Sequence, residues 1–471
     1  MEFYVYLSLL TILFGAVTLA VWRKTKAFAF MMGAFFLYFW SLFGGWNLVT
    51  SLRTGENTPY LFYKLFPVFL DDDYRNALLL YGAFIITVMM TVLICAKAAE
   101  ERVPPRQIIE ISHWKALVTG AFCGGLGFLF IRSAVSGSAS AYAQARELPG
   151  YSLFQILNHG GLCIAVIGLA TLMAGKRARF IGGRSSRLAL MGYLGLLGAL
   201  MLLLVKMGNR SEAALTFVLL LLFYMANTVK PSRILLVGTG TIGLVVLMIV
   251  KLFRDSLLSS GSGMNAVALL TRVKSELMQS TESVAAHLSM YGALHKHLPF
   301  TWGSSFLSLA ASVIPRGIWK DRPTTIYEYY ATGVAAMEGQ GYTIHHATGW
   351  YLNFGVVGVF AGAVMMGWCW AKLYNMVYDG KRRSSAFANA FAVIAFWTFT
   401  AGIPELLRAG PEAYKTTVIS EFLLPTFLVT LCSASIILRH QRPAVVFRHH
   451  ASRRVNGLRE GGQIAAPGVV R

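Results

Sequence analysis

Arginine side chains recur in three short polar segments that connect long apolar runs. Arg210 lies in the segment 208–212, Arg408 ends the segment 404–408, and Arg316 follows a proline in the segment 314–323. A guanidinium group stays charged at every working pH and matches the oxygens of a phosphate in pairs. Any single arginine at a helix end could instead contact lipid headgroups. Taken together the segments predict a phosphate or diphosphate site, with candidate residues Arg210, Arg316, Lys320, Arg322 and Arg408.

Two adjacent histidines and a glutamate are the candidates for accepting a proton. His345 and His346 directly precede a long apolar run, and Glu405 lies in the segment that Arg408 ends. A neutral histidine can take the proton of an attacking hydroxyl group, because imidazole titrates near neutral pH. Adjacent residues of a helix or strand point in different directions, so at most one of the pair can act. The alternative is that the two histidines cap the helix that follows, and the sequence leaves both interpretations open.

The run Asp71-Asp72-Asp73 could bind a divalent cation or cap the helix that begins there. We favour the cap, because the backbone N–H groups and the dipole at a helix N-terminus attract carboxylates.

All five cysteines lie in apolar runs, with neither a CxxC pattern nor the spacing of His/Cys metal ligands. We therefore expect no disulfide framework, no metal centre and no other cofactor.

These candidate residues lie between predicted membrane-spanning helices. The chain is 56% hydrophobic and only 13% charged, and its mean hydropathy is +0.57. Soluble domains are about 25% charged, whereas apolar runs of about 20 residues are typical of transmembrane helices. The sequence predicts an all-α, polytopic membrane protein. Its eleven expected spans are residues 3–21, 27–49, 77–96, 116–135, 153–174, 188–207, 213–229, 234–252, 350–372, 385–402 and 417–438.

Lysine and arginine residues predict the orientation of the chain. They concentrate in the connections after spans 1, 3, 5, 7 and 9 and in the C-terminal tail, and cytoplasmic connections are the ones that carry excess positive charge. The N-terminus and the long connection before span 9 are therefore expected outside, and the C-terminus in the cytoplasm. The expected organisation is spans 1–8 in 1–252, a large periplasmic loop in 253–349, spans 9–11 in 350–438 and a basic, disordered tail in 439–471.

The same features argue against two classes of function. The net charge is +21, but most cations lie at cytoplasmic membrane borders, where the orientation bias and anionic lipids account for them. Nucleic-acid binding is therefore not expected. The sequence contains no Walker A pattern, which argues against an ATP-driven pump.

Two parts of the long connection are expected to be structured. Residues 263–294 contain no proline and repeat apolar residues at helical spacing, which predicts an amphipathic helix lying on the outer membrane face. Residues 301–314 are too short to cross a membrane and predict an interfacial or re-entrant segment. Both segments suit the roof of a cavity.

The order of the polar segments resembles that of a known family. Gly-x-Arg-Ser at 208–211 is followed by Ile-Pro-Arg-x-x-Trp-Lys-x-x-Pro at 314–323 and by Tyr-x-Asn-Phe-Gly-x-x-Gly at 351–358. This looks like bacterial oligosaccharide repeat-unit polymerases, the O-antigen polymerase group, which are related to the O-antigen ligases. The resemblance covers about residues 205–370.

The resemblance implies a glycosyltransferase of the multi-span, lipid-phosphate-dependent, GT-C-like type in the bacterial inner membrane, and the related ligases act without metal. It would transfer a glycan from undecaprenyl diphosphate to the non-reducing end of another lipid-linked repeat unit, in the synthesis of lipopolysaccharide or a related surface polysaccharide. Arg210 and Arg316 match the family's outer arginines, and His345 or His346 resembles the ligase histidine. The implied partners are the lipid-linked oligosaccharide, membrane lipid and a chain-length-regulating co-polymerase.

Two other functions stay open at this point. Polymerases often have Ser or Glu where this chain has residues 346–350, and ligases more often have His-Asn where it has His-His-Ala. A ligase that moves finished glycan onto lipid A core or protein is therefore the first alternative. A transporter of lipid-linked oligosaccharide is the second, although the few charges at mid-span speak against it.

Overall fold

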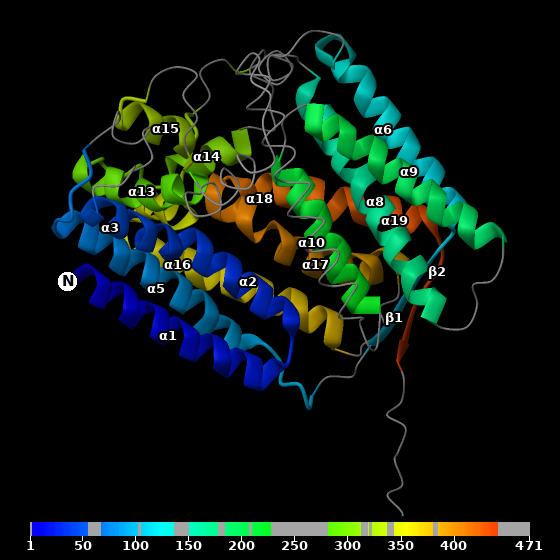
Figure 1. Ribbon diagram of the computed structural model, residues 1–471, viewed down its shortest axis with the longest axis horizontal. Helices are drawn as coiled ribbons and strands as arrows, with labels where there is room; N and C mark the ends of the chain where they lie inside the picture. Colours follow the sequence, from blue (N-terminus) through cyan, green and yellow to red (C-terminus); the bar gives the residue numbers. More distant parts are fainter. Residues whose placement is uncertain are drawn as a thin grey trace, which may run out of the picture. The chain divides into compact units, whose positions relative to one another are not determined.

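The long apolar runs fold into helices in the computed structural model, which describes residues 2–54, 67–101, 105–135, 150–177, 184–206, 210–227, 281–311, 319, 323–336, 343–379 and 385–440. Nine helices in this part of the chain are long and apolar enough to cross a membrane (Figure 1). Leu9, Ile12 and Ile94 are among the apolar side chains that stay exposed on them, which suits helices surrounded by lipid. The chain has the helical, multi-pass character that its composition predicts.

Each of the nine helices coincides with a predicted span. Six of them belong to α1 (Glu2–Thr25), α5 (Asp72–Cys95), α6 (His113–Val135), α8 (Tyr151–Arg177), α9 (Arg184–Lys206) and α17 (Ala386–Ala409). One combines α2 (Phe28–Tyr38), the π-helix η1 (Phe39–Phe43) and α3 (Gly44–Thr54). Another combines α18 (Ala413–Thr416), the π-helix η2 (Thr417–Leu423) and α19 (Leu424–Cys432). The ninth is α16 (His346–Tyr378).

Two predicted spans differ in length from the helices of the structure, and a third lies outside the described residues. The span 213–229 corresponds to α10 (Arg210–Asn227), whose apolar part, Ala213–Met225, is shorter than the nine candidates. The span 234–252 lies outside the described residues. The predicted end of the last span, at 438, is wrong, because the helix ends at Cys432 and Ser433–His440 forms strand β2. This strand pairs antiparallel with β1 (Pro105–Ile111), so that isoleucines, which favour strands, lie opposite one another.

The long connection contributes α13 (Thr281–His295) to the interior of the helix bundle. Its residues from Val284 to Ala293 are buried, and it packs against α5, η1 and α3. The prediction of a helix on the membrane surface is therefore wrong for residues 281–294. The rest of that predicted helix, 263–280, lies outside the described residues. The physical reason is that its polar residues His287 and Ser289 find hydrogen-bond partners inside the protein rather than in water.

Two short helices follow in the same connection. They are α14 (Ser304–Ala311) and α15 (Ile326–Gly333). The eight residues of α14 extend about 12 Å, so this segment is too short to cross a membrane, as its sequence predicts. A capping box between Thr325 and Glu328 fixes the start of α15.

The chain changes direction sharply inside α16, at Phe354 and Gly355. Both have non-helical backbone angles, with φ −141° and ψ 21° at Phe354 and φ 63° and ψ −149° at Gly355. A positive φ with this ψ is open essentially only to glycine. The side chain of Asn353 fixes the turn, because its Oδ1 accepts hydrogen bonds from Thr301 Oγ1 at 2.9 Å and Ser305 Oγ at 2.8 Å. The Asn-Phe-Gly part of the sequence motif is therefore a turn.

This turn folds residues 346–353 back against the long part of α16. A Cβ built on Gly362 would overlap the indole ring of Trp350, whereas these residues would lie about 18 Å apart in a straight helix. The long part, 356–378, extends about 34 Å and is sufficient to cross a membrane by itself. Residues 346–349, which precede Trp350, are therefore buried inside the helix bundle.

Close approach between α2 and α16 gives the first test. A Cβ on Gly33 would overlap the indole ring of Trp370, and that ring is fixed by its hydrogen bond to Thr400 Oγ1 at 3.0 Å. We expect Gly33→Ala to destabilise the protein by about 1–3 kcal/mol, because overpacking forces the ring or the helix to move. The measurement is the midpoint of thermal unfolding in detergent.

Gly15→Ala is the matched control, because a Cβ there meets nothing within 4 Å. It is expected to leave the midpoint unchanged or to raise it slightly, since alanine favours the helix by about 0.5–1 kcal/mol. Equal midpoints for the two variants would contradict the packing described here.

Candidate functional site

Most of the predicted arginine set lies outside the described residues. Arg316, Lys320 and Arg322 are not among them, and Arg210 is the first residue of α10, with a side chain that is not described. Whether these groups meet at a phosphate stays a prediction. Arg408 is in the last turn of α17, where its Nε lies 3.0 Å from Oε2 of Glu405. These two predicted site residues form an ion pair on one helix end.

The histidine pair lies beside this end of α17. The N–H of Ile344 donates to the carbonyl oxygen of Arg408 at 3.2 Å, and Ile344 forms a parallel β-bridge with Ala409. The structure therefore brings together four of the predicted site residues, His345, His346, Glu405 and Arg408.

His345 is fully buried, and both of its ring nitrogens have partners. Nδ1 accepts the N–H of Ala347 at 3.1 Å, which makes His345 the N-cap of α16. Nε2 lies 3.0 Å from Ser41 Oγ. Because Nδ1 accepts, the proton of a neutral ring is on Nε2 and is donated to Ser41. Burial, with His346 and His287 adding to it, holds the pKa of His345 well below its ordinary value.

His346 is also buried and fully hydrogen-bonded. Its Nδ1 lies 3.2 Å from the carbonyl oxygen of Leu406, and its Nε2 accepts the indole N–H of Trp350 at 3.1 Å. In this arrangement neither histidine has a free ring lone pair, so neither can accept a proton from a substrate without first breaking a hydrogen bond. The capping interpretation is confirmed for His345, and the structure gives no support to either histidine as the base.

His287 is a third buried histidine, and the sequence analysis missed it. Its Nδ1 donates to the carbonyl oxygen of Ser41 at 2.8 Å, and its Nε2 lies 3.0 Å from the hydroxyl of Tyr74. Ser41 belongs to η1, where the π-helix departs from regular i→i−4 hydrogen bonding. Burial lowers the pKa of His287 to about 4. The sequence feature that could have identified His287 is its spacing from Val284 and Tyr291, which places it on the apolar face of a helix.

Ser41 connects His287 and His345, because its carbonyl oxygen bonds the first and its hydroxyl group the second. The hydroxyl of Tyr81 lies 3.2 Å from Thr348 Oγ1, and Ser289 Oγ accepts the N–H of His345 at 2.9 Å. Segments far apart in the sequence therefore meet here, on α5, η1, α13 and the start of α16. We call this cluster the polar centre, and its members are Ser41, Tyr74, Tyr81, His287, Ser289, His345 and Thr348.

Glu412, between α17 and α18, is a further candidate that the sequence analysis passed over. Its Oε1 accepts the N–H of Ile326 at 2.6 Å, at the start of α15. Its neighbour Pro411 lies against the histidine segment, because a Cβ on Gly349 would overlap Pro411. Burial raises the pKa of Glu412 to about 7, although the Ile326 N–H acts against this. Such a carboxylate can anchor α15, and it can also accept a proton at neutral pH.

A second acidic residue lies within a candidate span. Glu421 of η2 is buried, and its carboxylate fits against Gly402, where a Cβ would come within 2.5 Å of Oε2. Ionisable residues inside membrane spans are costly and usually have a function. From the sequence alone, 417–438 is a predicted apolar span, and Glu421 is not among the candidate site residues.

The acidic run before α5 contains the predicted helix cap. The carboxylate of Asp71 accepts the N–H of Tyr74 at 2.9 Å and makes Asp71 the N-cap of α5. Asp72 forms an ion pair with Arg75 at 3.1 Å. The cap is therefore confirmed for Asp71.

The lowered pKa of His287 predicts a loss of stability in acid. The unfolded chain takes up a proton near pH 6.5, whereas folded His287 does so only near pH 4. Its contribution is fully present above pH 6.5 and decreases as the pH falls toward 4, by about 3 kcal/mol in all. We expect His287→Gln to reduce the slope of unfolding free energy against pH between 7 and 5, measured by denaturant titration in detergent.

The test is the slope of unfolding free energy against pH. The absolute free energy is not suitable, because His287→Gln also removes a hydrogen bond. His297→Gln is the control, since His297 is exposed at the end of the same segment. An unchanged slope in His287→Gln would contradict the burial of a neutral imidazole at this position.

Comparisons with known proteins give no further assignment. No protein family, no curated protein and no solved structure matches this chain. The geometry of the polar centre and its surroundings is therefore the basis for a functional proposal.

Proposed function

We propose that the protein is a polymerase of lipid-linked oligosaccharide repeat units, with eleven spans and a GT-C-like architecture in the bacterial inner membrane. It takes a glycan from undecaprenyl diphosphate and transfers it to the non-reducing end of another lipid-linked repeat unit. The reaction takes place on the periplasmic side, and a chain-length-regulating co-polymerase is the expected protein partner.

The observation that carries this proposal is the insertion of α13 into the bundle. Residues of the large connection, His287 and Ser289, lie within hydrogen-bond distance of Ser41, Tyr81 and the backbone of His345. Buried polar groups among membrane spans are costly, and those that occur usually serve a function. The hydrogen bonds of the polar centre fasten the large connection to the spans. This supports a site at the edge of the polar centre, built jointly from the large connection and the spans.

We assign the binding of the donor diphosphate to the arginines on the predicted periplasmic side. Arg210 and Arg316, with Lys320 and Arg322, would hold the phosphate oxygens and stabilise the negative charge that develops on the leaving diphosphate. Arg408 supports this placement, because the structure puts it beside the histidine segment. Its Nε forms an ion pair with Glu405.

We assign the role of general base to Glu412 rather than to a histidine. The ring lone pairs of His345 and His346 accept the N–H groups of Ala347 and Trp350, so these rings hold the segment in place. Glu412 combines a pKa of about 7 with a position next to Pro411, which contacts that segment. It is suited to take the proton of the acceptor hydroxyl as the new glycosidic bond forms.

The first test of the function uses purified protein supplied only with lipid-linked repeat units. The wild type is expected to lengthen them, and Arg316→Ala to lower the rate about 100-fold or more, because it removes a charged donor to the leaving group. Arg316→Lys should fall between them, since lysine keeps the charge but lacks the paired N–H groups. Gel electrophoresis of the products measures chain growth.

Lys296→Ala is the control, because Lys296 is an exposed cation of the same connection, and it should retain wild-type chain growth. Growth only after a separate acceptor is added would identify a ligase and overturn the polymerase assignment. Full activity of Arg316→Ala would remove Arg316 from the site.

The second test concerns the base. Because Glu412 must be ionised to accept a proton, the rate should rise with pH through about 7 and fall about tenfold per unit well below it. Glu412→Gln should lower the rate about 100-fold or more and flatten this profile. The measurement is the initial rate of chain growth between pH 5 and 8.

Glu405→Gln distinguishes the two carboxylates near the histidine segment. If Glu412 is the base, Glu405→Gln keeps the rise in rate through pH 7. An active Glu412→Gln protein with an unchanged profile, together with an inactive Glu405→Gln protein, would transfer the role to Glu405.

A further inference from the structure

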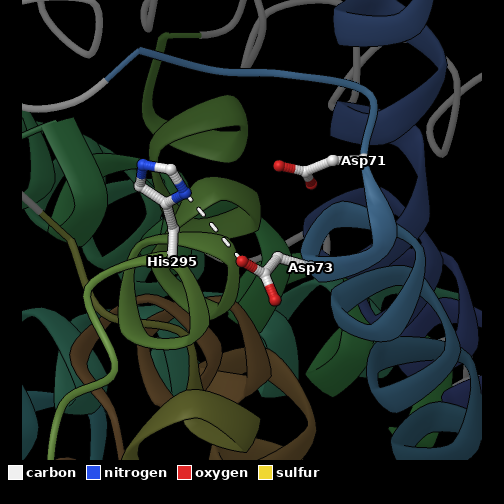
Figure 2. Close-up of side chains that lie close together, drawn as sticks. All are labelled: Asp71, Asp73 and His295. Atoms are coloured by element: carbon white, nitrogen blue, oxygen red, sulfur yellow. Dashed lines mark ion pairs between the residues drawn. The ribbon is translucent and has the colours of Figure 1, made fainter.

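Three side chains of types that can bind a metal ion meet at the ends of α5 and α13. Asp71 and Asp73 belong to the start of α5, and His295 is the last residue of α13. One ligand atom of each residue lies within 4.8 Å of the other two, and Figure 2 shows the three side chains gathered around one space. The residues come from segments more than 200 positions apart, so the fold of the large connection onto α5 creates this arrangement.

The distances within the cluster suit a shared ion better than direct bonds. His295 Nδ1 points at Asp73 Oδ2 from 3.9 Å, too far for a hydrogen bond (Figure 2). Two ligand atoms on one ion lie about 3–4 Å apart when each metal–ligand distance is about 2.0–2.2 Å. The side chains therefore need to move by less than about 1 Å to coordinate a cation.

Neighbouring contacts hold these side chains in place. Asp71 Oδ1 is fixed by the N–H of Tyr74 at 2.9 Å, while its Oδ2 lies 3.5 Å from the Tyr291 hydroxyl. The Tyr291 ring stacks on the imidazole of His295 with ring centres 5.2 Å apart and an interplanar angle of 18°. Contacts of this kind orient ligands in metal sites. They also explain why the imidazole faces the carboxylates rather than water.

The charge of the cluster favours a cation as well. Two carboxylates lie close together, and the nearby Arg75 is paired with Asp72. The side chains of Asp73 and His295 are 32% and 26% exposed, so an ion can reach them from solvent. A cation between them would offset the repulsion of the carboxylates.

We propose that Asp71, Asp73 and His295 form a binding site for one divalent cation. The donor set of two carboxylate oxygens and one imidazole nitrogen suits Mn²⁺ or Zn²⁺ better than Mg²⁺ or Ca²⁺, which prefer oxygen ligands alone. Water completes the coordination on the exposed side. The ion fastens α13 to α5 and so stabilises the position of His287 and Ser289 in the polar centre. The site stands independently of the glycosyltransferase proposal.

The test is a titration of MnCl₂ into the full-length protein in detergent after treatment with a chelator. Electron paramagnetic resonance of free Mn²⁺ should show one bound ion per chain, and the unfolding midpoint should rise with Mn²⁺ concentration. Asp73→Asn and His295→Gln should each weaken binding at least about tenfold, since each removes a ligand. Both readouts are independent of glycan transfer.

Asp72→Asn is the matched control, because it removes the same charge one residue away. It should leave the affinity and the stoichiometry unchanged. Equal weakening by Asp72→Asn and Asp73→Asn would mean that the acidic run attracts cations only diffusely, and it would overturn the site. Absence of stoichiometric Mn²⁺ and Zn²⁺ binding by wild-type protein that unfolds cooperatively would overturn it as well. If Asp73→Asn fails to fold, His295→Gln alone decides.

Discussion

The reversal of the chain at Phe354 and Gly355 is the constraint on which the candidate site depends. As one straight helix, α16 would extend about 50 Å, well beyond the apolar thickness of a membrane, and His345 would lie far from Ser41. The reversal instead brings His345 within 3.0 Å of Ser41. It requires a backbone angle at Gly355 that other residues avoid. It also requires a bare backbone at Gly362, where Trp350 packs. Two glycines and one indole therefore determine where the histidines lie.

Inside the bundle, the polar centre obeys the rule that buried polar groups must be hydrogen-bonded. Each ring nitrogen of His287 and His345 has one partner, which fixes the orientation of the rings, and burial favours their neutral form. Such an arrangement is suited to holding segments together rather than to moving protons. Glu412 and Arg408, at its edge, are only partly buried. The contrast between a rigid interior and a more exposed edge therefore follows from hydrogen bonding and burial together.

Periodicity and composition were sufficient to predict the helical class and the positions of the candidate spans, because apolar runs of this length have few other solutions in a membrane. The cap at Asp71 was also predictable, since capping depends on local sequence. The burial of α13 was not, because it depends on Ser41 and Tyr74, which lie more than 200 residues away. For the same reason the sequence could not pair Asp73 with His295. The raised pKa of Glu412 arises from burial in the folded state, which its local sequence does not reveal.

The contact between Gly402 and Glu421 has a consequence for the evolution of this chain. The carboxylate occupies the space that any side chain at position 402 would need. A larger residue at 402 therefore requires the side chain at 421 to move or to become shorter. In related sequences a larger residue at 402 should accompany a shorter one at 421, so that the two positions covary although 19 positions separate them. Sequences that keep an acidic residue at 421, within a membrane span, should therefore also keep glycine at 402 on the neighbouring helix.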